Sequence, residues 1–288
     1  MSDAGTILVT GANGQLGAEL AHALAPHGRV VATGRAELDL ADADAIVATM
    51  RTLRPAMVVN AAAYTAVDLA EKEEALAHAI NGVAPGILAD EAKRIGADLI
   101  HYSTDYVFDG RANAPYDEDA PVNPLSAYGR TKLAGERAVA ASGADALVLR
   151  TSWVYGLRGR NFLTTMQRLA RERDELRVVD DQAGAPNWSR ELARATARIV
   201  ANGRHVVVER RGLYHLTARG ATTWYGFARA ILADVPRVRI VPITTAEYPT
   251  PASRPAWSVL DTARFEQTFG FALPDWQVSL AECLASAP

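Results

Sequence analysis

Short apolar runs alternate with longer helix-forming segments throughout the first half of this chain. The runs are rich in valine, isoleucine and leucine, and they occupy residues 7–9, 30–32, 57–59, 98–100 and 147–149. Segments with helical spacing, such as residues 17–25 and 41–53, lie between them. Strands that helices cover on both faces are apolar throughout, and parallel neighbours need a crossover connection. The alternation therefore predicts an α/β fold with a Rossmann-like, doubly wound parallel sheet over residues 1–150.

Beyond residue 150 the alternation becomes less regular. Helices are expected near residues 162–173, 222–233 and 276–285, whereas three prolines in residues 248–257 predict a loop. We expect residues 151–288 to form mainly a smaller C-terminal substrate-binding lobe, interleaved with the last strands of the sheet. The chain length of 288 residues fits one large unit with such a lobe.

Charge and cysteine content exclude several classes of function. The net charge of −3 offers no basic surface for nucleic acid or for an anionic membrane. No apolar run reaches the roughly 18 residues that a membrane helix requires. The single cysteine, Cys283, cannot form an internal disulfide, and we expect an inert thiol on a C-terminal helix. These features are typical of a cytoplasmic protein.

A glycine-rich turn follows the first predicted strand and opens a helix. Its spacing is G-x-x-G-x-x-G, which differs from the G-x-G-x-x-G of standard dehydrogenases, and an ordinary β–α turn is the alternative. Glycines let backbone N–H groups approach a pyrophosphate, and the helix N-terminus favours the negative charge. The candidate cofactor contacts in this turn are Gly11, Asn13, Gly14, Gln15, Leu16 and Gly17.

The end of the second predicted strand indicates which dinucleotide binds. An acidic residue there holds a ribose 2′-hydroxyl, whereas an arginine accommodates a 2′-phosphate. Arg35 therefore favours NADP(H), with NAD(H) possible, although a solvated surface arginine is the alternative. Asp39 could bond the adenine edge or could cap the following helix, and Leu40 beside it is a further candidate cofactor contact.

Tyr128 and Lys132 lie four residues apart in a segment, residues 127–141, that is expected to be helical. Positions i and i+4 share one helical face, so the phenol and the ammonium can lie side by side. A free tyrosine titrates near 10, and a neighbouring cation lowers that pKa, which suits proton transfer. The Y-x-x-x-K spacing alone is weak evidence, because it occurs by chance in many helices.

Residues 103–110 add weight because they follow the fourth predicted strand, where ligands bind in open parallel sheets. Thr104 is the preferred candidate for holding a substrate carbonyl oxygen beside Tyr128, and Ser103 is its competitor. Asp105 and Asp109 could form a catalytic acid pair. We expect instead that they stabilise the loop through Asx turns.

Taken together, these segments resemble extended short-chain dehydrogenase/reductases, and more closely the dTDP-4-dehydrorhamnose reductase family. The resemblance covers nearly the whole chain. Its most specific markers are the STDYVFDG sequence of residues 103–110 and the DDQAGAP sequence of residues 180–186. Further markers lie in residues 60–68, 150–155 and 212–215.

The resemblance implies a catalytic triad of Thr104, Tyr128 and Lys132, with the last two also contacting the cofactor. It implies that residues 60–64 line the ribose and nicotinamide, with Ala61, Ala62, Ala63 and Tyr64 as the contacts. It places seven residues against a dTDP-sugar substrate: Thr104, Asp105, Tyr106, Trp153, Asn161, Gln182 and Arg254. A core position for Trp153 and a surface position for Arg254 are the alternatives.

The implied activity is NADPH-dependent reduction of the 4-keto group of dTDP-4-dehydro-6-deoxy-L-mannose (dTDP-4-dehydro-β-L-rhamnose) to dTDP-L-rhamnose. The alternatives are another extended sugar-nucleotide enzyme, such as an epimerase or dehydratase, and a non-catalytic regulatory subunit on the same fold. Arg35 and the DDQAGAP sequence argue against an epimerase, and the intact Tyr128–Lys132 pair argues against a non-catalytic subunit.

The chain departs from the family pattern at two places. Asn187-Trp188-Ser189 follows Pro186, where the family usually carries a small hydroxyl residue, so the pocket edge differs. Some relatives form a magnesium-linked dimer through glutamates, but position 15 is Gln15 and the C-terminus carries no acid. We therefore expect no functional metal, and either a monomer or a homodimer.

Overall fold

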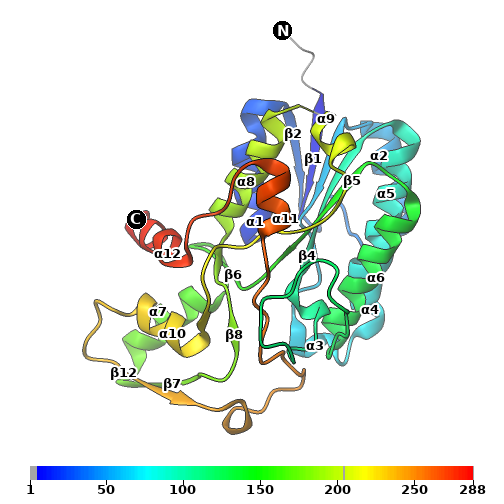
Figure 1. The fold of residues 1–288 in the computed structure, drawn as a ribbon. Helices are drawn as coiled ribbons and strands as arrows, with labels where there is room; N and C mark the ends of the chain where they lie inside the picture. The colour runs from blue at the N-terminus through cyan, green and yellow to red at the C-terminus, as the bar shows by residue number, and fades with distance from the viewer. Residues whose placement is uncertain (1–4, 204, 288) are drawn as a thin grey trace.

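A six-stranded parallel sheet forms the centre of the computed structural model, which describes residues 5–203 and 205–287. The strand order is β10-β5-β4-β3-β1-β2 (Figure 1). The strands are β1 (Thr6–Thr10), β2 (Arg29–Thr33), β3 (Met57–Asn60), β4 (Asp98–Thr104), β5 (Ala146–Thr151) and β10 (Gly212–His215). Neighbouring strands run parallel, with Leu8 opposite both Val31 and Val58. The predicted α/β sheet is confirmed.

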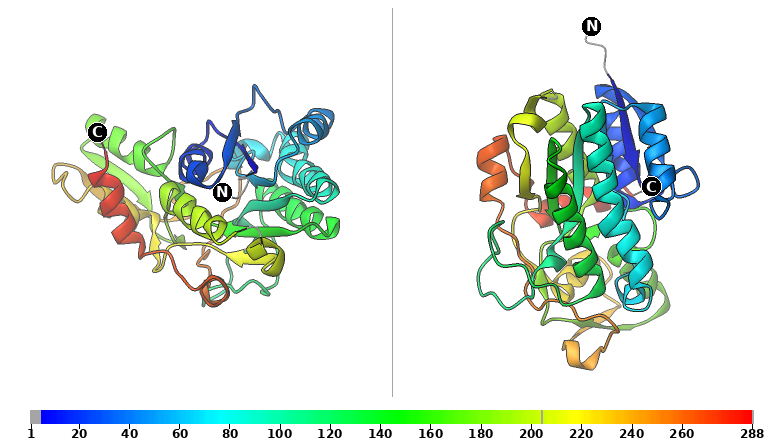
Figure 2. Two further views of the ribbon diagram at one scale, coloured as in Figure 1. Left: turned by 90° about the horizontal axis from the view of Figure 1, so that it is seen from above. Right: turned by 90° about the vertical axis from the view of Figure 1, so that its right-hand side faces the viewer.

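Helices cover both faces of this sheet (Figure 2). One face packs against α1 (Gln15–Leu24), α8 (Ser189–Ala201) and α11 (Ala263–Phe269). The other packs against α2 (Ala43–Leu53), α5 (Ala84–Ile95) and α6 (Ala127–Ser142). Alternate strand residues enter the two cores, so Val9 and Leu8 lie in different clusters. None of the helices in the described ranges is long and apolar enough to cross a bilayer.

The second half of the chain contributes to both parts of the molecule. Its α8 and β10 belong to the sheet layers, and the elements after residue 151 also form a lobe with its own apolar core. The larger lobe elements are α7 (Phe162–Glu172), β7 (Glu175–Val179), α10 (Trp224–Ile231), β12 (Arg239–Ile243) and α12 (Trp276–Ala285). The chain therefore crosses from the lobe to the sheet layers and back.

Shorter elements connect these parts. The two-residue strands are β6 (Val154–Tyr155), β8 (Ala183–Gly184), β9 (Asn187–Trp188) and β11 (Thr222–Thr223). The short helices are α3 (Val67–Ala70), α4 (Glu74–His78), α9 (His205–Glu209), the π-helical turn η2 (Ala79–Val83), and the 3-10 turns η1 (Ala25–His27), η3 (Asp105–Val107) and η4 (Thr245–Glu247).

A buried ion pair joins α6 to the sheet. Arg150 of β5 donates to both carboxylate oxygens of Glu136 on α6, at 2.9 and 2.7 Å. The two side chains are only 3% and 7% exposed. Ser103 of β4 donates to the same carboxylate at 2.5 Å, so the pair connects one helix with two strands. A charge-assisted, fully bonded pair of this kind holds its elements in one relative position.

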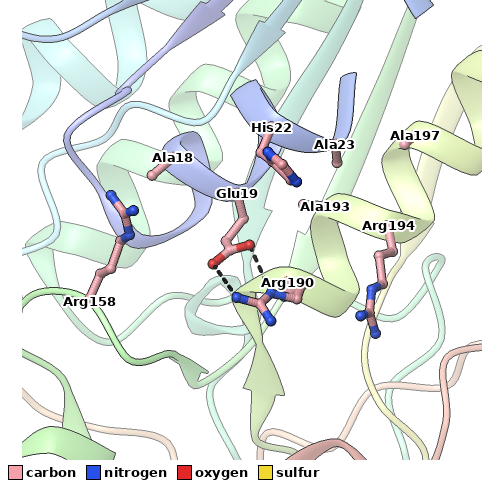
Figure 3. Close-up of a pocket in the computed structure, with 9 residues that line it drawn as sticks. All are labelled: Ala18, Glu19, His22, Ala23, Arg158, Arg190, Ala193, Arg194 and Ala197. Atoms are coloured by element: carbon pink, nitrogen blue, oxygen red, sulfur yellow. Dashed lines mark hydrogen bonds and ion pairs between the residues drawn. The ribbon is translucent and has the colours of Figure 1, made fainter. Parts of the chain in front are cut away.

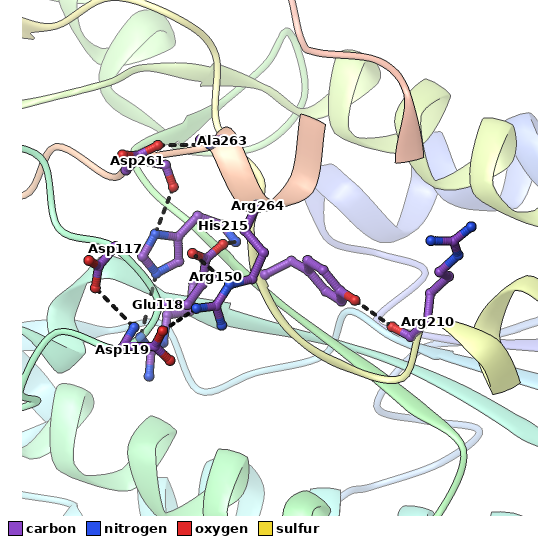
Figure 4. A network of polar contacts seen from close by, with 10 residues as sticks. Asp117, Glu118, Asp119, Arg150, Arg210, His215, Asp261, Ala263 and Arg264 are labelled. Carbon is purple, nitrogen blue, oxygen red and sulfur yellow. Dashed lines mark hydrogen bonds and ion pairs between the residues drawn. The ribbon is translucent and has the colours of Figure 1, made fainter. Parts of the chain in front are cut away.

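A second group of polar residues surrounds the other side of Arg150 (Figure 4). His215 accepts from Arg150 at 3.5 Å, and its other ring nitrogen donates to the Asp261 carbonyl at 3.1 Å. Burial and the nearby Arg150 lower the pKa of His215 to about 3, so this imidazole is neutral. Glu118 accepts from the His215 backbone N–H at 2.9 Å and pairs with Arg264 at 3.5 Å.

Replacing Glu136 with glutamine tests the importance of the buried pair. The substitution leaves the Arg150 charge buried and unpaired, which costs about 3–5 kcal/mol of unfolding free energy. Glu172→Gln is the matched control, because Glu172 pairs with Arg168 on the exposed surface of α7, where a pair contributes about 0.3–0.5 kcal/mol. Urea denaturation that shows equal, small effects for both variants would contradict a stabilising role for the buried pair.

Candidate active site

The glycine turn lies at the carboxyl edge of the sheet, between β1 and α1. Gly11 has a φ of +76°, and a Cβ there would lie 2.9 Å from the Ala62 backbone. A Cβ on Gly17 would lie 2.1 Å from the Gly11 carbonyl oxygen. Both positions therefore require glycine, because the turn folds tightly against itself and against the residues after β3.

The N-terminus of α1 suits an anion. Its N-cap, Gly14, provides no side-chain hydrogen bond, whereas Asp42, Ser126 and Asn161 cap α2, α6 and α7. No acidic residue lies in its first turn. A long helix that begins this way at a glycine turn has donors and a dipole directed at a bound phosphate. This observation fits a dinucleotide.

The other predicted residues of the turn have different surroundings. Leu16 packs in the sheet core, and the Asn13 amide lies against Gly34 at the end of β2. Gln15 donates to the Val154 carbonyl at 3.5 Å, and its Oε1 is buried with no partner among the described residues. The side chain of Gln15 therefore lies between the turn and the start of the lobe.

The segment after β2 carries both signs of charge. Arg35 is 73% exposed and pairs with Asp39 at 3.1 Å. Asp39 also accepts from the Ala41 N–H at 2.9 Å, and these contacts lower its pKa, the backbone bond most. Glu37, which was not predicted from the sequence, accepts from the Gly34 N–H at 2.8 Å. An acidic side chain in the turn that follows β2 is the sequence feature that could have indicated Glu37.

One prediction for this segment changes. The suggestion that Asp39 caps the next helix is wrong, because Asp42 accepts from the Ala45 N–H and caps α2. Leu40, a candidate cofactor contact, is buried in the core with Ile46 of α2. Its side chain therefore contributes to packing in this structure.

Residues 61–64 follow β3 and lie beside the glycine turn, with the Ala62 backbone against Gly11. The Ala62 N–H donates to Thr10 at 3.2 Å, while Ala61 and Ala63 are half-buried neighbours. Asn81 accepts from the Tyr64 N–H at 2.8 Å and donates to the Tyr64 carbonyl at 3.0 Å. Asn81 was not predicted, because its role depends on a contact across 17 residues.

The structure brings Thr104, Tyr128 and Lys132 together. Ser126 caps α6 by accepting from the Gly129 N–H at 3.2 Å, so the helix begins directly before Tyr128. The hydroxyl of Thr104 interacts with the phenol of Tyr128. Lys132 is buried and donates to the Tyr102 carbonyl of β4 at 2.6 Å.

Burial controls the titration of this group. It raises the pKa of Tyr128 to about 12, which the contact with Thr104 partly opposes. It lowers the pKa of Lys132 to about 8, which the charge of Glu136 partly opposes. The expected lowering of the Tyr128 pKa by Lys132 is therefore not found, since desolvation of the phenol dominates and the ammonium bonds the Tyr102 carbonyl.

The choice between the two hydroxyls depends on where β4 ends. Ser103 and Thr104 were expected just beyond the strand, but both belong to it. Successive strand residues point to opposite faces. Ser103 donates to Glu136 and is held in the buried ion pair, whereas Thr104 interacts with Tyr128, so Thr104 is the hydroxyl available to the site.

Asp105 and Asp109 differ in environment. Asp109 accepts from the Arg111 N–H at 3.1 Å, an Asx turn as expected, and also from Tyr116 and Asn123. These bonds lower its pKa. Asp105 makes no such turn, so that part of the prediction is wrong. Its carboxyl group is buried beside Thr104, and burial raises its pKa to about 6.

Trp153 follows β5 with a strained φ of +43° and stacks on Trp224. The ring centroids are 3.6 Å apart and the planes are 7° from parallel. Gly184 lies against the same indole, since a Cβ there would approach it to 2.6 Å. Gln182 accepts from the Trp224 indole N–H at 3.2 Å and donates to Thr245 at 2.9 Å, so both ends of its amide are used within the protein.

Asn161 and Arg254 are also engaged. Asn161 caps α7 by accepting from the Thr164 N–H at 3.1 Å, and it donates to the Gly156 carbonyl at 2.8 Å. Arg254 is partly buried and pairs with Asp68 of α3 at 2.8 Å. This pair fixes the proline-rich loop beside Tyr106, whose ring packs edge-on against Tyr128 at 5.5 Å.

Asn187, the residue at the departure from the family pattern, is fully buried. It donates to the carbonyls of Ser152 and Ala185 at 2.7 and 2.8 Å, and it accepts from the Ala218 N–H at 2.6 Å. Its amide therefore ties three chain segments together beneath Trp153.

A separate cavity of about 640 Å³ lies between α1 and α8 (Figure 3). Arg190 pairs there with Glu19 at 3.1 Å, and none of the predicted site residues lines it. Over the residues that the structure describes, no group of three or more histidine, cysteine, aspartate or glutamate side chains is placed to hold a metal ion.

Known proteins share both the sequence and this arrangement. The family model described as the RmlD substrate binding domain matches residues 5–287. The dTDP-4-dehydrorhamnose reductase of Burkholderia thailandensis is 49% identical, over 96% of this chain and 97% of the relative. That of Escherichia coli K12 is 44% identical, over 96% of each chain.

The solved structure of dTDP-4-dehydrorhamnose reductase from Bacillus anthracis, in complex with NADP, superposes with a TM-score of 0.92. It is 34% identical, and the match covers 98% of this chain and 99% of that one. With a family model that spans nearly every residue and relatives of this similarity, the chain belongs to the RmlD substrate-binding-domain family.

Proposed function

We propose that this chain reduces the 4-keto group of dTDP-4-dehydro-6-deoxy-L-mannose with NADPH and releases dTDP-L-rhamnose. The observation that carries the proposal is the meeting of Thr104, Tyr128 and Lys132 at the carboxyl edge of the sheet, beside an uncapped helix N-terminus. The names of the similar reductases support the substrate.

Each member of the triad has a distinct task. When bound, NADPH supplies the hydride that reduces C4 of the keto-sugar. Tyr128 donates its proton to the developing alkoxide, and its raised pKa keeps the phenol protonated at neutral pH. Lys132 supplies positive charge beside the phenolate that remains. Thr104 donates a hydrogen bond to the carbonyl oxygen as negative charge develops there.

Arg35 is proposed to select the cofactor. Its guanidinium group is exposed at the end of β2 and can bond a 2′-phosphate. Glu37 and Asp39 nearby allow a 2′-hydroxyl to be held as well, so NADPH is preferred and NADH is accepted. The Bacillus anthracis relative, solved with NADP, supports this preference.

The substrate side is proposed to lie between η3 and the proline-rich loop. Asp105, Tyr106 and Arg254 converge there, and a guanidinium group suits a diphosphate. Trp153 offers a flat apolar surface to the sugar. Gln182 supports that surface through Trp224, and Asn161 fixes the adjoining loop, because both side chains are already bonded.

The remaining proposals concern the setting of the protein. A buried, isolated Cys283 suits a reducing compartment, so we place the enzyme in the cytoplasm. We propose that it works as a monomer or homodimer without a divalent metal.

A stoichiometric assay tests the function. We expect one NADPH to be oxidised per freshly prepared 4-keto-6-deoxy-L-sugar nucleotide, and much slower oxidation with D-configured analogues. Conversion of the sugar nucleotide without net NADPH consumption would indicate an epimerase and contradict the proposal.

Tyr128→Phe removes the proton donor but retains the ring. Turnover should fall at least about 100-fold, while NADPH binding measured by fluorescence stays nearly unchanged. Tyr214→Phe is the control, because that hydroxyl bonds the Arg210 carbonyl next to β10. Near-normal turnover in folded Tyr128→Phe would remove Tyr128 from the proposed mechanism.

Arg35→Ala tests the choice of cofactor. Loss of a charged hydrogen bond to the 2′-phosphate should weaken NADPH binding by about 1.5–3 kcal/mol and leave NADH binding unchanged. Arg29→Ala provides the control, since Arg29 begins the same strand at its opposite end. Equal losses for NADPH and NADH would show that Arg35 does not discriminate between them.

A further inference from the structure

Asp105 is an unusual carboxyl group in this site. The residue is 1% exposed, and its Oδ2 atom has no hydrogen-bond partner in the described part of the chain. The Ser258 hydroxyl donates to the Ala183 carbonyl at 3.3 Å and also lies near the Asp105 carboxyl group. Oδ1 accepts from the Thr104 hydroxyl at 2.9 Å, and the backbone N–H groups of Asp105 and Tyr106 likewise favour the ionised form. Burial outweighs these contacts, so the neutral acid is favoured relative to an exposed carboxyl group.

The hydroxyl of Thr104 has only one proton to give. It already accepts from the Tyr106 N–H at 3.2 Å. When Asp105 is ionised, both carboxylate oxygens only accept, so the Thr104 proton must point toward Asp105 at 2.9 Å. The hydroxyl can then accept from Tyr128, but it has no proton left for a substrate carbonyl.

Protonation of Asp105 reverses this direction. A neutral carboxyl group is a donor through its O–H. With the proton on Oδ1, Asp105 donates to Thr104, and the Thr104 hydroxyl is free to donate its own proton elsewhere. No proton crosses to the substrate by this route. Tyr128 still supplies the proton that completes the alcohol.

We propose that Asp105 is a positioning residue whose protonated form turns the Thr104 hydroxyl toward the substrate carbonyl, and whose ionised form turns it away. This inference rests on the proposed reduction and adds to it a fourth residue, which acts on the substrate carbonyl through Thr104.

The charged and titratable groups around Asp105 come from several elements. Tyr106 on η3 and Tyr128 on α6 interact with Asp105 directly. Arg254 on the proline-rich loop and Asp68 on α3 act on Tyr106. Arg254 is paired with Asp68, which limits its ability to favour the ionised carboxylate. Burial raises the pKa of Asp105 to about 6, so the group titrates close to neutrality. An anionic sugar nucleotide bound nearby favours the neutral form further.

The protonation state of Asp105 gives the pH dependence a definite sign. Below about pH 6 Asp105 is protonated and Thr104 donates forward, whereas above it the hydroxyl is directed back. The value of kcat/KM, which reports the free enzyme, should therefore fall about tenfold per pH unit above roughly pH 6 until it reaches a plateau. In kcat the same descent should begin at higher pH, because substrate is bound.

Variants of the two loop carboxylates separate this effect from general acid–base behaviour. Asp105→Asn offers Thr104 an amide donor at every pH, so we expect the pH profile of kcat/KM to lose its descent, whatever the absolute value of kcat/KM. Asp109→Asn is the matched control and should keep the descent, because Asp109 bonds only its own loop. A descent retained by Asp105→Asn overturns the proposal.

A second measurement does not depend on turnover or on the Asp105→Asn variant folding. Carboxyl ¹³C NMR can follow Asp105 directly in the wild-type protein and in Thr104→Val. Removing the hydroxyl that bonds the ionised form should raise the Asp105 pKa by about one unit. An unchanged pKa would overturn the proposal. If the wild type instead fails to oxidise NADPH with the keto-sugar, the proposed function fails while this coupling can still be measured.

Discussion

The ion pair between Glu136 and Arg150 is the interaction on which the site depends. It fixes α6 to β4 and β5 at a point one helical turn beyond Lys132. The same helix carries Tyr128 at its start, and β4 carries Thr104 at its end. A small rotation of α6 would separate these side chains. By fixing α6 against the sheet, the pair therefore fixes the relative positions of the side chains proposed to transfer the proton.

Burial of the site has consequences beyond packing. It keeps the Tyr128 phenol protonated and brings the Lys132 ammonium close to its titration range. It also raises the pKa of Asp105, whose Oδ2 atom has no hydrogen-bond partner in the described part of the chain. Because hydrogen bonds are stronger in a dry site, the direction of one threonine proton can influence the reaction. The same desolvation thus acts on both the phenol of Tyr128, the proposed proton donor, and the carboxyl group beside Thr104.

Local sequence patterns were sufficient for the sheet, the glycine turn and the Tyr128–Lys132 pair, because each depends on short-range periodicity or spacing. Side chains whose role depends on distant partners were not predictable. Asn81, Glu37 and Asn187 became evident only from contacts across the fold. The bonds of the Gln182 amide to Trp224 and Thr245 likewise depend on distant segments. The choice between the adjacent hydroxyls of Ser103 and Thr104 also required the fold, because Ser103 bonds Glu136 and Thr104 interacts with Tyr128.

The proposed site delivers one hydride to C4 of a sugar nucleotide and one proton to its oxygen. Reduction with NADPH deuterated at nicotinamide C4, on the face from which transfer occurs, tests this transfer most directly. We predict one deuterium per product molecule, located only at C4 of the sugar, as seen by NMR and mass spectrometry. Deuterium at another carbon, or product formed without deuterium from either labelled face, would contradict the proposed hydride transfer.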